Sequence, residues 1–137
     1  MKKSFLSIET SLNRIFLVLH FRDNLISNSK TLEKSIEVEI NQMFYEILEK
    51  GRANFSDIHY IMISMGPGSY TGTRVGLAAA KAIAVSINKP ILGYTNFNAI
   101  YNQGIIDSFI KRNSSTGVLI KASKYDVYYQ QIKNNIF

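Results

Sequence analysis

The sequence contains no cysteine among its 137 residues. This absence excludes disulfide frameworks, thiol catalysis, cysteine-bound zinc and iron–sulfur clusters. Long apolar runs are also missing: the uncharged stretch 15–19 near the amino end is far shorter than the ~20 residues that a membrane-spanning helix needs. Met1-Lys2-Lys3 imitates the start of a signal peptide, but Glu9 interrupts the apolar residues that follow. We therefore expect a cytoplasmic protein with no membrane partner.

Acidic residues are scarce in the second part of the chain. Residues 58–137 hold only Asp107 and Asp126 against eight Lys and Arg, whereas residues 1–57 hold eight of each sign. The whole net charge of +6 therefore lies in the second part. A basic surface can attract RNA. These basic residues are scattered singly, however, which favours an ordinary solvated surface.

The hydrophobic pattern predicts a mixed α/β fold with the order β-β-β-α-β-α-β-α-β-β. Strands are expected at 5–8, 15–19, 25–26, 58–65, 91–93, 118–120 and 127–129, and helices at about 33–49, 71–87 and 96–104. The run 58–65 is typical of a central strand covered on both faces. Thr31 is expected to cap the first helix, and Lys50-Gly51 to close it.

Half of the eight glycines lie between Gly66 and Gly76, after a buried strand and at the start of a helix. Backbone N–H groups in such a place can meet an anion. The segment nevertheless lacks the Gly-Lys pair of a P-loop and the spacing of the dinucleotide fingerprint. A tight turn with a hydroxyl cap from Ser69 or Thr71 is an equal alternative. The residues assigned to anion contact are Glu9, Thr10, Gly66, Gly68, Ser69, Thr71 and Lys81.

A ridge of small residues runs along the second helix, because glycine or alanine recurs there every four positions. Such a ridge lets another helix or a sheet approach closely. Packing on the domain's own sheet explains it as well as a partner does. We expect a partner interface made by Gly72, Gly76, Ala80 and Ala84, together with Ile36, Ile40 and Met43 of the first helix. A bulky Gly76→Leu substitution should then disrupt pairing.

No catalytic set emerges from the residues. His20 and His59 lack metal-ligand spacing, and Ser69 lacks the G-x-S-x-G elbow of serine hydrolases. We therefore expect no catalytic residue and no metal site. Tyr125, Tyr128 and Tyr129 lie near basic residues and can stack on RNA bases, although their alternation also suits an ordinary strand.

The segment 66–81, Gly-Pro-Gly-Ser-Tyr-Thr-Gly-Thr-Arg-Val-Gly-Leu-Ala-Ala-Ala-Lys, resembles the GPGS(F/Y)TG(x)R(I/V)G signature of the TsaB family, also called YeaZ. The flanks agree: Ile8-Glu9-Thr10-Ser11 lies where the family's first strand ends in Asp-Thr-Ser, and 90–95 resembles its Pro-(x)-(I/V)-G-(V/I)-(S/T) segment. Lys121-Ala122-Ser123 lies where relatives have a strand ending in Asp-Ala-Arg. The similarity covers essentially the whole chain.

The resemblance implies an actin-like ATPase or RNase H-like fold. It implies a single domain over 1–137, with the amino-terminal lobe at about 1–105 and the start of a second lobe at about 106–137. It also implies a noncatalytic subunit that binds a TsaD-type enzyme, which forms threonylcarbamoyladenosine next to the tRNA anticodon. TsaE and the TsaC or Sua5 enzyme act in the same pathway. The two helices that flank the glycine segment are implicated in dimerisation, so a homodimer is an alternative, and tRNA contact is expected to be indirect or weak.

Three departures from the family pattern bear on ligands. Glu9 replaces the strand-end Asp, Lys34-Ser35 replaces His-Ser, and the sequence ends at Phe137, where relatives have a second lobe. That lobe supplies the other half of a nucleotide cleft, so we expect no cofactor and find little support for ATP or ADP. Two alternatives remain: an anion- or nucleotide-binding enzyme that uses Glu9, Ser69, Thr71 and Lys81, or a decayed remnant that self-associates.

Overall fold

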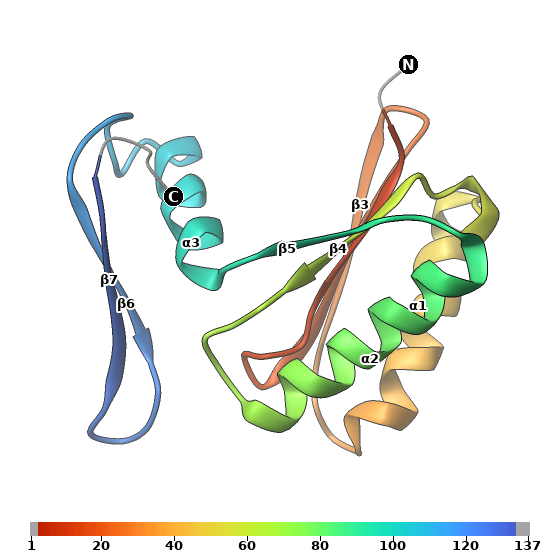
Figure 1. The fold of residues 1–137 in the computed structure, drawn as a ribbon, viewed down its shortest axis with the longest axis horizontal. Helices are drawn as coiled ribbons and strands as arrows, with labels where there is room; N and C mark the ends of the chain where they lie inside the picture. The colour runs from red at the N-terminus through yellow and green to blue at the C-terminus, as the bar shows by residue number, and fades with distance from the viewer. Residues whose placement is uncertain (1–2, 134–137) are drawn as a thin grey trace.

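A computed structural model describes residues 3–133, so the signal-like Met1-Lys2 and the end at Phe137 lie outside it. The chain forms a five-stranded sheet with two long helices, followed by a third helix and a two-stranded hairpin (Figure 1). The elements are β1 (Phe5–Glu9), β2 (Arg14–Phe21), β3 (Asn24–Thr31), α1 (Ile36–Gly51), a 3₁₀ turn (Phe55–Asp57), β4 (Tyr60–Ser64), α2 (Tyr70–Ile87), β5 (Ile91–Tyr94), α3 (Asn96–Ile106), β6 (Thr116–Lys121) and β7 (Val127–Ile132). The expected element order is confirmed.

The large sheet has the order β3-β2-β1-β4-β5. The first three strands form an antiparallel meander, whereas β4 pairs parallel to both β1 and β5. A parallel pair needs a crossover connection, and α1 and α2 provide the two crossovers. The carboxyl ends of β1, β4 and β5 therefore lie at the same end of the sheet, and the glycine segment begins at that end.

The main core lies between the sheet and the two long helices. Alternate residues of the strands are fully buried towards α1 and α2, as the period of a β-strand requires. One apolar stripe of α1 packs on the same core: Ile36, Ile40, Met43, Phe44 and Ile47. The most buried members are Leu6, Ile8, Ile15, Leu17, Leu19, Met43, Ile47, Ile58, Ile61 and Ile63.

Among residues 3–133 nothing covers the other face of the sheet in this way, so the expectation that the central strand is covered on both faces is wrong for the described part of the chain. Both long helices lie on one side of the sheet (Figure 1), and α3 packs on the hairpin instead. On the open face Phe5 stacks between His20 and Tyr60, with ring centroids 5.4 Å apart in both pairs. These rings are half-buried because they cover one another.

The start of α1 also differs from the expectation. Thr31 does not cap the helix, because it is the last residue of β3. The N-cap residue is Ser35, whose side chain makes no capping hydrogen bond. At the other end the helix continues through Gly51, and Arg52 takes the left-handed conformation that ends it, with φ of 50°.

Buried Glu39 holds the turn into α1. Its Oε1 accepts hydrogen bonds from the backbone N–H groups of Glu33 (3.2 Å) and Lys34 (2.7 Å), and its Oε2 lies 3.5 Å from Lys30 Nζ. Burial alone raises the pKa of Glu39, but these N–H donors and the Lys30 ammonium outweigh it. The pKa of the Glu39 carboxyl therefore lies below its ordinary value of 4.5. Glu39 is therefore an interior residue of α1 in spite of its charge.

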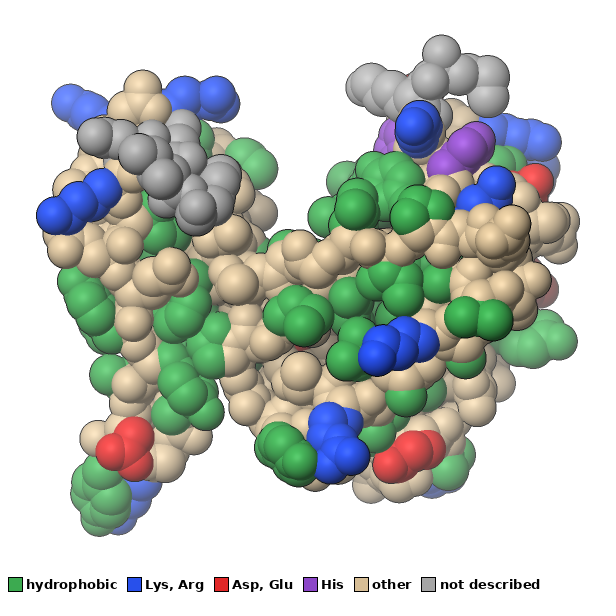
Figure 2. Space-filling view, viewed as in Figure 1, with side chains coloured by type: hydrophobic (Ala, Val, Ile, Leu, Met, Phe, Trp, Pro, Cys, Tyr) green, Lys and Arg blue, Asp and Glu red, His purple; other side chains and the backbone are tan. Residues whose placement is uncertain are grey.

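The hairpin part has a small core of its own, formed by Tyr101 of α3 with Val118, Ile120 and Ile132. The opposite face of the hairpin is open, and Leu119 and Tyr129 are each at least 60% exposed there. An open notch separates this part from the sheet part (Figure 2). No helix within residues 3–133 is both long and apolar enough to cross a membrane.

We predict that Glu39→Gln lowers the free energy of unfolding at pH 7. A carboxyl with a lowered folded-state pKa stabilises the fold above its unfolded pKa, and this contribution disappears as the pH falls through the folded-state pKa. Urea titrations from pH 7 to pH 3 should therefore show a deficit for the variant that shrinks as the solution becomes acidic. Exposed Glu37→Gln is the matched control, and equal pH profiles for the two variants would contradict the prediction.

Candidate functional site

The glycine segment lies directly against the end of β1. A Cβ atom on Gly68 would collide with the carbonyl group of Ser11, and one on Gly72 would collide with the carbonyl group of Thr10. One on Gly76 would collide with the Thr10 side chain. Gly68 and Gly72 are required because backbone meets backbone there, and Gly76 leaves room for the Thr10 side chain.

Two hydrogen bonds join the surfaces that the glycines bring together. The Ser69 N–H donates to Ser11 O (2.7 Å), and Thr10 Oγ1 donates to Gly72 O (2.7 Å). Ser69 also caps α2, because its Oγ accepts the Gly72 N–H at 3.2 Å. Of the two cap candidates, Ser69 is therefore the residue that caps.

Beside the glycine segment lies a buried polar group that we call the strand-end cluster: Glu9, Ser11, Ser64 and Asn96. Glu9 Oε1 accepts hydrogen bonds from the Ser11 N–H (2.6 Å) and from Ser11 Oγ (2.5 Å). Asn96 Nδ2 donates to Ser11 Oγ (2.7 Å), and Ser64 Oγ donates to Asn96 Oδ1 (2.7 Å). All four residues are at most 6% exposed. The cluster thus ties the ends of β1 and β4 to the start of α3.

Asn96 connects the cluster to the glycine segment as well. Its Nδ2 donates to Pro67 O (2.9 Å), and its N–H donates to Gly66 O (2.8 Å). Sequence reasoning missed this residue. A signal was present, because Asn96 follows β5 as Ser11 follows β1, and polar residues after parallel strands meet at one edge of a sheet.

Tyr94, the last residue of β5, lies on the open face of the sheet near Glu9. Burial raises the pKa of Tyr94. The hydroxyl contact with Ser7 Oγ, at 3.3 Å, acts in the opposite direction, and the nearby Glu9 carboxylate raises the pKa further. The phenol is therefore neutral at pH 7, and it can donate or accept a hydrogen bond.

The residues assigned to anion contact are only partly brought together. Glu9, Thr10, Gly66, Gly68 and Ser69 lie around the strand-end cluster. Thr71 is exposed in the first turn of α2. Lys81 is twelve residues beyond Ser69 along the helix, about 18 Å at the rise of an α-helix.

The backbone donors of the glycine segment are largely occupied by the fold. The N–H of Gly66 donates to Ser64 Oγ, and that of Thr73 donates to Ser69 O, in addition to the bonds of Ser69 and Gly72. Glu9 Oε2 is buried with no hydrogen-bond partner, which places an uncompensated acceptor beside the segment. Within residues 3–133 no group of three or more His, Asp or Glu side chains is placed to hold a metal ion. This geometry favours a tight turn with a cap over an anion site.

The ridge of α2 faces the chain's own sheet. All seven residues assigned to a partner interface are buried: Gly72, Gly76, Ala80, Ala84, Ile36, Ile40 and Met43. The small residues let α2 lie close to β1 and β4, which is the own-sheet alternative. These side chains are not available to a partner, and Gly76→Leu would disturb the fold rather than report on an interface.

The outward faces of the same two helices do carry exposed apolar residues. Val38 and Tyr45 of α1 are 62% and 81% exposed, and Val85 of α2 is 81% exposed. α2 also presents Ala78 and Ala82, which are exposed. A surface of small and apolar residues on two adjacent helices can accept further helices. The sequence analysis assigned a partner interface to these two helices, but through their inward residues.

The chain is similar to known proteins both in sequence and in structure. A family model described as TsaD: tRNA N6-adenosine threonylcarbamoyltransferase matches residues 28–135. The tRNA threonylcarbamoyladenosine biosynthesis protein TsaB of Buchnera aphidicola subsp. Acyrthosiphon pisum is 28% identical over 140 residues, which cover 100% of this chain and 62% of that relative. A tRNA N6-adenosine threonylcarbamoyltransferase of Dictyoglomus turgidum is 32% identical over 82 residues, covering 51% of this chain and 25% of that protein. YeaZ from Pseudomonas aeruginosa superposes with a TM-score of 0.84 at 17% identity, over 96% of this chain and 61% of that one.

The fold is therefore of the actin-like ATPase and RNase H-like class, as expected. The chain belongs to the TsaB (YeaZ) family, within the wider group that the TsaD family model describes. It spans about three fifths of the length of these TsaB and YeaZ relatives. The lobe boundary expected near residue 105 stays a prediction.

We predict that Asn96→Ala destabilises the chain by about 3 kcal/mol, because it leaves buried polar partners on Ser11, Ser64 and Pro67 unsatisfied. Urea unfolding measures this loss. Asn102→Ala is the control, since Asn102 is exposed and its side chain bonds only the Asn98 carbonyl of its own helix. A similar small effect for both variants would show that the strand-end cluster does not hold the fold together.

Proposed function

We propose that this chain is a noncatalytic subunit that binds a TsaD-type enzyme and supports the formation of threonylcarbamoyladenosine in tRNA. The observation that carries the proposal is the apolar outward surface of α1 and α2 in a chain of the TsaB family. The relatives' names place them in the same tRNA modification. TsaE and the TsaC or Sua5 enzyme are proposed as members of that pathway, without a contact on this chain.

The docking surface is proposed to be the outward faces of the two helices. Their inward faces are fully used by the sheet, so a partner meets only residues such as Val38, Tyr45, Ala78, Ala82 and Val85. Small residues on α2 allow a partner helix to approach closely. A TsaD-type enzyme is the proposed occupant because the same family model describes TsaD and matches this chain, and pairing between related folds can use the same helices on both sides.

The strand-end cluster supports a binding role rather than catalysis. Its polar groups donate to and accept from one another inside the fold, and the described residues around it form no nucleophile with a base. The tRNA is proposed to contact the complex chiefly through the partner enzyme. A homodimer through the same helices is the competing assembly.

The first test is light scattering on a size-exclusion column, with this chain alone and mixed with the TsaD protein from its own source. A stable one-to-one complex is expected. Two separate peaks, with this chain folded by circular dichroism, would contradict a binding role. A dimer of this chain that persists in the mixture would favour the homodimer instead.

We predict that Ala78→Arg or Ala82→Arg weakens the complex with the TsaD-type protein by about thirtyfold or more in Kd, because a charged side chain is forced into a close helix contact. Ala99→Arg, on an exposed position of α3, is the matched control. Calorimetric titration measures the affinities, and circular dichroism checks that the variants fold. Unchanged affinity in folded Ala78→Arg and Ala82→Arg chains would remove α2 from the interface.

A further inference from the structure

The strand β5 leaves one edge of the large sheet open. It is the last strand in the order, and among the described residues 3–133 it pairs only with β4. The Ile61 N–H donates to Pro90 O (3.0 Å), and the Met65 N–H donates to Tyr94 O (2.8 Å). In a parallel ladder every second residue bonds the neighbouring strand, so the backbone N–H and C=O groups of Ile91 and Gly93 point away from β4.

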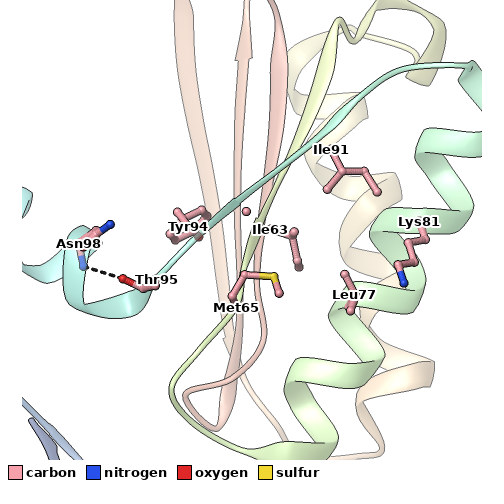
Figure 3. A pocket seen from close by; sticks show the side chains of 9 residues that line it. Ile63, Met65, Leu77, Lys81, Ile91, Tyr94, Thr95 and Asn98 are labelled. Atoms are coloured by element: carbon pink, nitrogen blue, oxygen red, sulfur yellow. Dashed lines mark hydrogen bonds between the residues drawn. The ribbon is translucent and has the colours of Figure 1, made fainter. Parts of the chain in front are cut away.

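An apolar groove of about 420 Å³ runs beside this edge, between β5 and α2. Figure 3 shows Ile63, Leu77 and Ile91 around it, with Met65 at one end. Gly93 contributes to the hollow because it has no side chain: a Cβ there would lie 3.1 Å from Met65 Cγ. The space-filling view shows apolar side chains gathered on this face (Figure 2). The groove can therefore take an apolar side chain from outside.

A single basic residue borders the groove. Lys81 extends along its α2 side (Figure 3), and its side chain is exposed. Within residues 3–133 the structure gives Lys81 no ion pair. Its charge is thus available to a carboxylate that enters along the edge.

From these three features we propose that β5 is a docking edge for an extended peptide segment of a partner protein, which adds a sixth strand to the sheet. The partner's backbone bonds the outward groups of Ile91 and Gly93, an apolar side chain enters the groove, and an Asp or Glu two residues away pairs with Lys81. Backbone bonds provide affinity and the two side-chain sites provide selectivity, as in other cases of strand addition. The helix surface proposed for the TsaD-type enzyme does not include this edge.

The open backbone groups favour a strand over other occupants. A helix satisfies its own backbone hydrogen bonds and would leave the groups of Ile91 and Gly93 unpaired. A small amphiphilic carboxylate could reach both the groove and Lys81 but would likewise leave the edge open. A second copy of this chain fits the edge less well than an acidic peptide. It brings a second Lys81 close to the first, and its own β5 segment 90–95 contains no acidic residue that could pair with Lys81.

The test is selection from a displayed library of random ten-residue peptides on the whole chain. Enriched peptides are expected to alternate apolar and polar residues and to contain Asp or Glu. The Lys81→Glu variant is expected to bind them about tenfold more weakly and to select Lys or Arg instead. Lys111→Glu, which reverses an exposed charge away from β5, is the matched control and should keep the acidic preference.

Amide hydrogen exchange with a selected peptide locates the contact. Slower exchange at Ile91 and Gly93, with little change at Leu92 and Tyr94, supports strand addition because only the first two N–H groups are open. No enriched peptide, or the same acidic preference in Lys81→Glu, overturns the proposal. Protection of Ile91 and Gly93 in the chain alone, together with a dimer by light scattering, overturns it in favour of a second copy. Saturable decanoate binding that depends on Lys81, with no effect of peptides on exchange, overturns it in favour of a small carboxylate.

Discussion

The close approach of the glycine segment to the end of β1 is the constraint on which the rest of the structure depends. Three glycines allow backbone atoms to meet where side chains would collide with Thr10 or Ser11. That contact sets the distance between α2 and the sheet, and hence the packing of Ala80 and Ala84 in the core. Beside that contact, Ser11 bonds both the buried Glu9 carboxylate and the Asn96 amide, so the polar cluster adjoins the place where the backbones meet.

The fold could be predicted from the sequence wherever one physical signal dominated. The helical spacing of Ile36, Ile40 and Met43, and the density of branched residues in 58–65, identified α1 and β4 because each is a periodic burial pattern. The cap of α1 was predicted wrongly, because Thr31 has the right chemistry but is used by β3. The turn before the Ser35 N-cap is held by Glu39, which bonds N–H groups five and six residues back along the chain, and composition alone does not distinguish such a residue from its exposed neighbours.

The candidate site could be predicted less well, for a related reason. A ridge of small residues has the same sequence pattern whether it meets a sheet or a partner, and only the three-dimensional structure separates the two cases. Here the ridge meets the sheet, so only the outward faces of the two helices, with residues such as Tyr45, Ala78 and Val85, are exposed. Asn96 was missed because its partners Ser11 and Ser64 lie 85 and 32 residues away in sequence. Family resemblance supplied what local pattern could not, since the glycine motif is long and specific.

The place of Asn96 has a mechanical consequence for the hairpin. Asn96 is the first residue of α3, and its backbone and side chain are both fastened to the glycine segment. α3 in turn packs on β6, and Leu12, which follows the end of β1, packs against the hairpin core as well. The hairpin part is therefore joined to the sheet part by residues that follow the carboxyl ends of β1 and β5. The residues that hold the glycine segment in place thus also position the hairpin beside the notch.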